Sequence, residues 1–342
     1  MFGQYNLNDN SYNSTNAYLT MTACHFVFPA SYHAAIGLPN NTPRQQQHRE
    51  VIYEISARSF FISQGFTGVY PVSATRTGVN ALVLTNDDYC MVVFRGTEML
   101  GSEVFFKSDM AQNSRLGQSR GGVRYGGRGV KVHTGLATAA RSVANRISGL
   151  LSRHGAGPGR RKPVIVTGHS LGGAMATITA FDLNRLRHNV QSVYSHAGYM
   201  VGNGAFADAY GRANIPYHRT VNKDDAVPEF PQNLLEMSSL IESFIAPGSG
   251  LQTKLVRQLN SVGQWFDIPV SLNSAYTHVP GTLAYINHND HIRINPDYLE
   301  MREARRPGLN TTHHDTRLYR KALYKALPRR MKTLALRVLD LA

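Results

Sequence analysis

Cysteine is scarce in this chain of 342 residues. The two cysteines, Cys24 and Cys90, are too few for a framework of disulfides or for a metal site built from cysteine. Their number fits a reducing compartment without requiring one.

Long apolar runs are also missing, and so is a basic leader. Residues 1–16 contain no Lys or Arg and therefore lack the positive region of a secretory signal peptide. No apolar stretch approaches the roughly 20 residues that a membrane-spanning helix needs. We therefore expect no cleavable signal peptide and no transmembrane helix. Either a cytoplasmic or membrane-peripheral location or export by a signal-independent route is compatible with this expectation.

Charged residues make up only 17% of the chain, which excludes a coiled coil and a highly charged disordered protein. The charge that is present is mostly basic, with 36 Lys and Arg against 22 Asp and Glu and a net charge of +14. Between Met110 and Phe181 there is no acidic residue at all. Such an excess favours anionic partners, either nucleic acid or an anionic membrane surface.

The order of predicted elements indicates an α/β fold in one domain with a mostly parallel sheet. Residues 1–16, rich in Asn and Ser, are predicted to be a flexible arm, 17–327 the folded domain, and 328–342 a basic amphipathic tail. The Gly- and Arg-rich segment 112–131 is predicted to be a loop. Strands are expected in hairpins over 81–95 and 281–294 and at 164–167, 192–199 and 217–222, and helices at 17–35, 50–64, 136–152, 171–187 and 316–341.

The strongest local signal is the segment Gly168-His169-Ser170-Leu171-Gly172. It has the pattern G-x-S-x-G between a β-rich strand and a helix-forming segment, which is the context of a nucleophile elbow. The serine on such a turn lies at a helix N-terminus, where free N–H groups favour developing negative charge. Ser170 is therefore the predicted nucleophile.

A nucleophilic serine needs a base, and the base needs a carboxylate that orients it. In α/β-hydrolases the order along the chain is Ser, then Asp or Glu, then His. Several acids and histidines follow Ser170, so order alone does not choose among them. The candidate acids are Asp182, Asp208, Asp224, Asp225 and Glu229, and the histidines are His188, His196, His218, His278, His288, His291, His313 and His314.

Further motifs decide this choice through a family resemblance. Together with the elbow, they resemble the class 3 lipases, the fungal-type triacylglycerol lipase group of the α/β-hydrolases, over roughly residues 51–327. The segments that carry the resemblance, in chain order, are VVFRGT at 92–97, VHTGL at 132–136, VGN at 201–203, NKDDAVP at 222–228, HVPG at 278–281 and HDTRLY at 314–319.

The resemblance implies a triad of Ser170, Asp225 and His314 on an α/β-hydrolase fold. Asp224 is the rival acid, but its spacing to Val227-Pro228 is wrong by one residue, and His313 is the rival base. His278 corresponds to a structural position of the family. A buried, hydrogen-bonded role is expected for the histidine of the VHTGL segment.

The same resemblance implies the rest of the site. The oxyanion donors are the backbone N–H groups of Thr97 and Leu171, and neither a metal nor an organic cofactor is required. A lid is expected directly after the oxyanion turn, with apolar contacts from Met99, Leu100, Val104 and Phe105. The family pattern is altered near this segment, where Phe106 stands in place of a tryptophan.

These observations predict a serine carboxylic-ester hydrolase of the lipase or phospholipase A type. The expected partner is lipid at a membrane or droplet surface, preferably an anionic one, and no nucleic acid. An exported toxic effector would in addition require a neutralising partner protein. Two alternatives stay open: an esterase or acyltransferase on soluble substrates, and a basic lipid- or nucleic-acid-binding protein on an inactive hydrolase scaffold.

Overall fold

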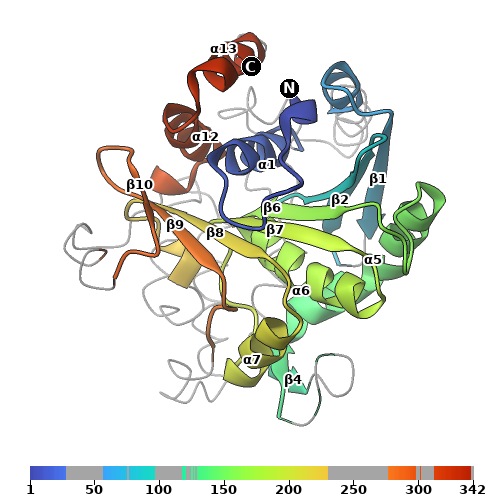
Figure 1. Cartoon of the computed structure of the whole chain (residues 1–342). Coiled ribbons are helices and arrows are strands. Elements are labelled where there is room, and N and C mark those ends of the chain that lie inside the picture. The colour runs from blue at the N-terminus through green and yellow to red at the C-terminus, as the bar shows by residue number, and fades with distance from the viewer. Residues whose placement is uncertain are drawn as a thin grey trace, which may run out of the picture.

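The molecule is built around an eight-stranded sheet with the order β1-β2-β3-β6-β7-β8-β9-β10 (Figure 1). The five strands from β3 to β9 are parallel, and each end of the sheet is an antiparallel hairpin. The computed structural model describes residues 1–27, 57–74, 77–96, 118–120, 125, 127, 129–229, 276–297, 301 and 312–339.

The strands of this sheet are β1 (Gly68–Ala74), β2 (Val79–Thr85), β3 (Cys90–Phe94), β6 (Val164–His169), β7 (Val190–His196), β8 (Tyr217–Asn222), β9 (Thr282–Ile286) and β10 (Ile292–Ile294). A separate two-stranded sheet pairs β4 (Gln118–Arg120) with β5 (Lys131–His133). Among the described residues, the labelled helices are α1 (Ser14–Phe26), α5 (Thr134–Arg153), α6 (Leu171–Arg185), α7 (Gly204–Arg212), α12 (Thr316–Lys325) and α13 (Arg329–Leu339), with short 3₁₀ turns η1 (Phe2–Gln4), η3 (Val227–Glu229) and η4 (Thr312–His314). Residues 57–63 are also helical.

Helices cover both faces of the sheet and bury one apolar core on each side. On one face α5 and α6 pack against strands that include Val83, Val92 and Val166. On the other face α1, α12 and α13 pack with side chains such as Leu84, Val93 and Ile165. The central strands β3 and β6 are buried along their whole length, so they are apolar throughout rather than alternating.

The first sixteen residues do not form the flexible arm that their composition predicts. Phe2 is fully buried against the sheet, and the hydroxyl of Tyr89 donates a 3.0 Å hydrogen bond to its carbonyl oxygen. The Tyr5 hydroxyl lies 2.7 Å from the Ser192 Oγ. The Asn- and Ser-rich composition hides these two aromatic anchors, because burial of a few large rings outweighs the polarity of the residues between them.

Most predicted elements are present, with shifted ends. Both hairpins are confirmed. Helix α1 begins at Ser14 because the Asn13 side chain accepts a hydrogen bond from the Asn16 N–H and caps it. The predicted loop over 112–131 is wrong at 118–120, where β4 pairs with β5. The sequence also has a helical apolar pattern over 232–268, and that segment lies outside the described residues.

The C-terminal segment packs against the body of the molecule through one stripe. In α13, Met331 and Ala335 are four residues apart and buried, whereas Arg329, Arg330 and Leu336 are exposed. No helix in the described part of the chain is long and apolar enough to cross a bilayer. Cys24 and Cys90 are both buried free thiols, and burial raises the pKa of Cys24 to about 12 and that of Cys90 to about 11.

Candidate active site

Ser170 lies on a strained turn between β6 and α6. Its backbone has φ 58° and ψ −127°, an unfavourable conformation for a residue with a side chain. The turn is held by a hydrogen bond from the Ser170 N–H to the carbonyl oxygen of His196, at 2.9 Å. The Ser170 carbonyl accepts from the Gly173 N–H at the start of α6. This is the geometry of a nucleophile elbow, with the serine half-buried at the helix N-terminus.

The two glycines that flank this turn are required by close backbone approach. A Cβ on Gly168 would lie 2.1 Å from the carbonyl oxygen of Gly172, and a Cβ on Gly172 would lie 2.4 Å from the carbonyl oxygen of Phe94. Both neighbours are backbone atoms that cannot rotate aside. The G-x-S-x-G pattern is therefore a consequence of how tightly α6 approaches β3 and β6.

His314 and Asp225 form a hydrogen-bonded pair near the elbow. The Nδ1 of His314 lies 2.9 Å from Oδ2 and 3.1 Å from Oδ1 of Asp225. A carboxylate only accepts hydrogen bonds, so the proton of a neutral His314 is on Nδ1 and its Nε2 is left as a base. Asp225 is fully buried, and the side chain of His314 is 14% exposed.

The Asp225 carboxylate has further donors that hold it in place. The Tyr319 hydroxyl donates to Oδ2 at 2.7 Å, and the Val227 N–H donates to Oδ1 at 3.0 Å. The Tyr319 oxygen in turn accepts from the Asn222 N–H. These bonds explain two spacings of the sequence: the acid stands two residues before Val227, and the tyrosine follows His314 by five residues.

The contact between the rings of His169 and His314 shows that the His314 imidazole lies beside the elbow. The centroids of the two rings are 4.6 Å apart, and His169 immediately precedes Ser170. Burial lowers the pKa of His169 well below its usual range, and the neighbouring rings of His314 and His196 lower it further. His169 is therefore neutral near pH 7 and does not repel a proton on His314. Ser170 Oγ makes no hydrogen bond to His314 among the described residues, and such bonds are often long before substrate is bound.

The rival residues occupy other positions. Asp224 lies near His288 and His313, whereas Asp225 faces His314. His278 precedes β9, and the register of β8 and β9 places it at the opposite end of these strands from Asp225. His133 is buried, and its Nδ1 caps α5 by accepting from the Leu136 N–H at 3.4 Å. The catalytic roles of Ser170, Asp225 and His314 stay predictions.

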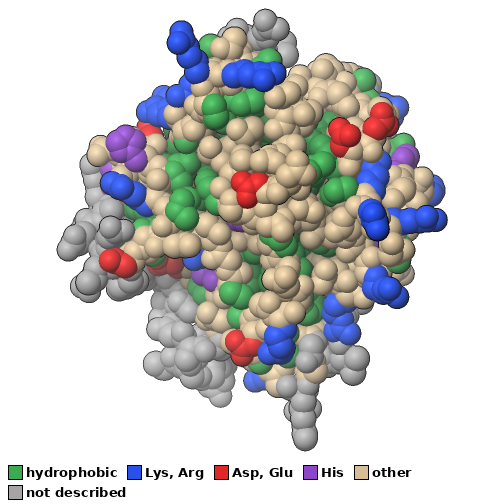
Figure 2. Space-filling model, in the orientation of Figure 1, with side chains coloured by type: hydrophobic (Ala, Val, Ile, Leu, Met, Phe, Trp, Pro, Cys, Tyr) green, Lys and Arg blue, Asp and Glu red, His purple; other side chains and the backbone are tan. Residues whose placement is uncertain are grey.

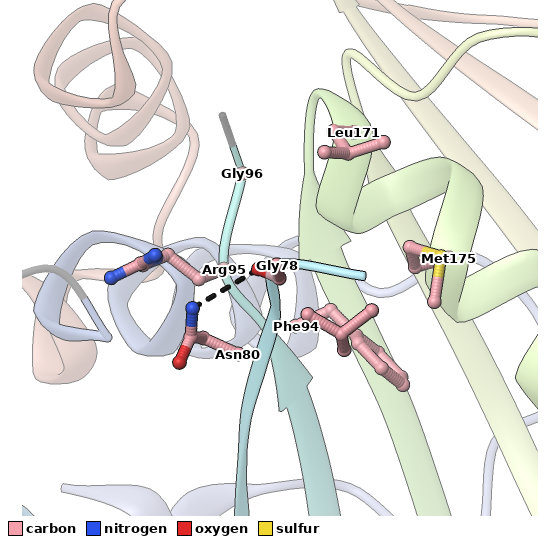
Figure 3. A pocket seen from close by; sticks show the side chains of 8 residues that line it. Gly78, Asn80, Phe94, Arg95, Gly96, Leu171 and Met175 are labelled. Atoms are coloured by element: carbon pink, nitrogen blue, oxygen red, sulfur yellow. Dashed lines mark hydrogen bonds between the residues drawn. The ribbon is translucent and has the colours of Figure 1, made fainter. Parts of the chain in front are cut away.

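A small hollow lies beside Leu171, the predicted oxyanion donor of the elbow (Figure 3). Figure 3 shows Phe94 and Met175 against it and Arg95 turned away from Leu171. The hollow is lined by Gly78, Val79, Asn80, Phe94, Arg95, Gly96, Leu171 and Met175. The other predicted donor, Thr97, and the predicted lid residues Met99, Leu100, Val104 and Phe105 lie outside the described residues.

Sequence reasoning missed two groups near this pair. Tyr319 was identified only as a motif residue. The five-residue spacing of Tyr319 from His314 is the signal that could have revealed its contact with Asp225. Sequence reasoning gave no role to His288, whose side chain reaches Asp224 from the turn between β9 and β10. No sequence pattern indicates that contact, because the two residues are 64 positions apart.

Residues 91–235 match the model of the family described as Lipase (class 3). The lipase of Rhizopus niveus is 36% identical over 127 residues, which cover 36% of this chain and 32% of that protein. The lipase of Rhizomucor miehei is 38% identical over 108 residues, with 30% and 29% covered. Phospholipase A1-Igamma2 of Arabidopsis thaliana is 30% identical over 109 residues, with 30% and 21% covered. The chain thus spans about a third or less of these relatives.

Solved structures resemble the chain over most of its length. A triacylglycerol lipase whose catalytic centre is described as a serine protease triad aligns with a TM-score of 0.52 and 19% identity, covering 90% of this chain and 98% of that one. The lipase from Rhizopus microsporus var. chinensis aligns with a TM-score of 0.52 and 20% identity, with 89% and 87% covered. At this identity the likeness concerns the fold, and it confirms the predicted α/β-hydrolase fold.

Proposed function

We propose, for a chain that belongs to the class 3 lipase family, that it is a serine carboxylic-ester hydrolase acting on lipid. The observation that carries this proposal is the His314–Asp225 pair beside a serine on a nucleophile elbow. The curated relatives are named lipases and phospholipases A1, which supports a lipid ester as the substrate.

In the proposed reaction, Nε2 of His314 takes the proton of Ser170 Oγ, which attacks the ester carbonyl carbon. Asp225 holds the imidazole through Nδ1 and stabilises the cation that forms. The N–H of Leu171, at the start of α6, and that of Thr97 stabilise the negative oxygen of the tetrahedral intermediate. Its collapse releases the alcohol, with the proton returned by His314. Water then hydrolyses the acyl-enzyme with His314 again acting as the base.

We further propose that an anionic lipid surface is the preferred location of the substrate. Helix α12 begins two residues after His314 and leads into α13, so the basic side chains of these two helices follow the site along the chain. Lys321, Arg329 and Arg330 are exposed there. Each basic residue near an anionic leaflet contributes about 1 kcal/mol of attraction.

The variant Ser170→Ala tests the chemistry. We expect hydrolysis of a lipid panel to fall by at least about a thousandfold, because the nucleophile is removed. A fluorophosphonate probe should label the wild-type chain at Ser170 and leave the variant unlabelled. The panel compares triacylglycerol with zwitterionic and anionic phospholipid.

Two results would contradict the proposal. Ester hydrolysis that persists in a folded Ser170→Ala variant removes the serine mechanism. A wild-type chain that binds vesicles of these lipids but hydrolyses none of them would be a lipid-binding protein rather than a hydrolase. The dependence of rate on substrate concentration separates a lipase from a soluble-substrate esterase, since only the lipase accelerates when lipid aggregates form.

A further inference from the structure

A second cluster of a carboxylate and imidazoles lies directly beside the Asp225–His314 pair. The side chain of Asp224 is 2% exposed, and its Oδ1 lies 3.1 Å from Nε2 of His288. Its Oδ2 lies 3.8 Å from Nδ1 of His313. The cluster is therefore attached on one side to the turn between β9 and β10 and on the other to η4, the turn that carries His314.

His288 is presented to Asp224 by a well-defined turn. The Asn287 side chain accepts hydrogen bonds from the N–H groups of Asn289 and His291, and the Asp290 N–H donates to the Asn287 carbonyl. Asp290 forms ion pairs with Lys223, at 2.8 Å, and with Lys325 of α12. The segment 223–225 is thus joined to the same turn by two neighbouring contacts, Lys223 with Asp290 and Asp224 with His288.

The chain before His314 is fixed from β8 as well. The Asn222 side chain donates a 3.0 Å hydrogen bond to the His313 carbonyl oxygen. The His313 ring is 5.9 Å from that of His288, so both imidazoles face the Asp224 carboxylate. Other titratable groups near Asp224 include its chain neighbours Lys223 and Asp225, and Tyr285. The described residues contain no group of three His, Cys, Asp or Glu suited to hold a metal ion.

We propose that Asp224 and His288 are positioning residues for the imidazole of His314, an inference that rests on the proposed hydrolase function. A buried carboxylate that loses one donor reorients toward the donors that remain, because losing a hydrogen bond is costly for a buried acceptor. The nearest imidazole nitrogen is Nδ1 of His313, just beyond hydrogen-bond length. Closing 3.8 Å to about 2.9 Å takes about 1 Å of movement, shared between the Asp224 carboxylate and His313. His314 is the next residue and moves with it, which disturbs its contact with Asp225.

The test uses the full chain with three substitutions in the hairpin turn. His288→Ala removes the contact, and His288→Gln restores a donor near the position of Nε2. His291→Gln is the matched control, since His291 is an exposed histidine of the same turn. Because a misplacement of about 1 Å can cost about a hundredfold in rate, we expect kcat of His288→Ala on a soluble p-nitrophenyl ester to fall about ten- to a hundredfold at unchanged KM. His288→Gln should recover most of the loss, and His291→Gln should match the wild type.

A second readout does not depend on turnover. The proton on Nδ1 of His314, bonded to Asp225, gives a far-downfield proton resonance that is assigned by its loss in His314→Gln. We expect it to shift in His288→Ala and to stay in place in His291→Gln. Wild-type kcat with an unmoved resonance in His288→Ala overturns the proposal, and so does an equal loss in His291→Gln. If the wild-type chain neither hydrolyses esters nor reacts with a fluorophosphonate, the proposed function fails, and the resonance still decides whether His288 positions His314.

Discussion

The Asp225 carboxylate shows how one residue is made ready for its proposed role. Both oxygens accept hydrogen bonds, from the His314 imidazole, the Tyr319 hydroxyl and the Val227 N–H. The carboxylate lies inside the protein, and these donors satisfy its oxygens. The same donors fix the orientation of the carboxylate, which in turn fixes the ring of His314 and the nitrogen that remains free to act as a base.

Tyr319→Phe tests this at the residue scale. Removing the hydroxyl takes one donor from Asp225 and one acceptor from the Asn222 N–H, both inside the protein. We expect the free energy of unfolding to fall by about 1–3 kcal/mol and kcat to fall about tenfold through misplacement of the pair. Denaturant unfolding and steady-state hydrolysis measure the two effects.

Tyr324→Phe is the control for that variant. Tyr324 is on the same helix, α12, and its ring contacts Tyr18 rather than the site. Its kcat should equal that of the wild type. A Tyr319→Phe variant with wild-type kcat and stability would mean that the hydroxyl contributes nothing to holding Asp225.

At the scale of elements, the strand β6, the turn at Ser170 and the helix α6 form one rigid unit. The positive φ of Ser170 is maintained because the carbonyl of His196 in β7 holds its N–H and the first turn of α6 holds its carbonyl. Close packing of α6 onto the sheet requires small residues in its first turns, which the sequence supplies as Gly172, Gly173 and Ala174. The conformation of this half-buried serine is thus a product of tertiary packing on both sides of the turn.

Gly168→Ala tests the packing of this unit. The new methyl group would meet backbone atoms of Gly172 at 2.1 and 2.2 Å, so α6 must move away from the strand. We expect a loss of about 3 kcal/mol or more in the free energy of unfolding. The measurement is denaturant unfolding followed by circular dichroism.

Gly149→Ala provides the comparison, because Gly149 lies inside α5 with nothing within 4 Å of the added Cβ. That substitution should stabilise the chain by roughly 0.5–1 kcal/mol. Similar unfolding midpoints for the two variants would show that the elbow tolerates a side chain and that the glycine is not required by packing.

At the scale of the whole molecule, two groups of exposed basic side chains stand out among the described residues. The C-terminal basic surface consists of Lys321, Arg329 and Arg330 on α12 and α13. The strand-end basic surface consists of Arg153, Arg160 and Arg161, with Arg187 beside them through the bond from the Gly159 N–H to the Arg187 carbonyl. Figure 2 shows basic side chains at the edge near α5 and at the end where α13 lies.

The strand-end basic surface lies at the wrong end to assist the site. It precedes β6 and β7, whereas Ser170 follows β6. The six residues of β6 separate the two by on the order of 20 Å. Arg153, Arg160 and Arg161 of the acid-free stretch therefore do not contribute to a lipid-binding face around the site, and a flat membrane that contacts this end would face away from Ser170.

A pair of variants with equal charge tests which surface meets lipid. Replacing Lys321, Arg329 and Arg330 with Gln should lower the rate on anionic vesicles by roughly a hundredfold, from about 1 kcal/mol per residue, and leave the rate on zwitterionic vesicles unchanged. Replacing Arg153, Arg160 and Arg161 with Gln removes the same charge and should have a much smaller effect. The loss should diminish at high salt, because screening weakens the attraction in the wild type. Equal losses in the two variants would assign the effect to net charge.

The sequence by itself determined most of the order of strands and helices, and it determined the elbow, but it did not predict β1 or α7. Periodicity predicted both hairpins, β6, α6 and the parallel core, because these elements depend on local propensity and on burial that the apolar pattern encodes. The glycine pattern identified Ser170 because the close approach of α6 to the sheet excludes any side chain at Gly168 and Gly172. The spacing to Val227 favoured Asp225 over Asp224, because the Asp225 carboxylate accepts a hydrogen bond from the N–H two residues later in the chain.

Only the tertiary structure decided which side chains from distant segments meet. Four contacts join residues that are distant in the chain. They are the packing of the first residues, the pairing of β4 with β5, the hydrogen bond from the Tyr319 hydroxyl to Asp225, and the contact of His288 with Asp224. Composition also could not reveal where the positive charge lies, since a sum of charges contains no positions. Strand direction places each loop at one edge or the other, and that arrangement exists only once the parallel sheet has formed.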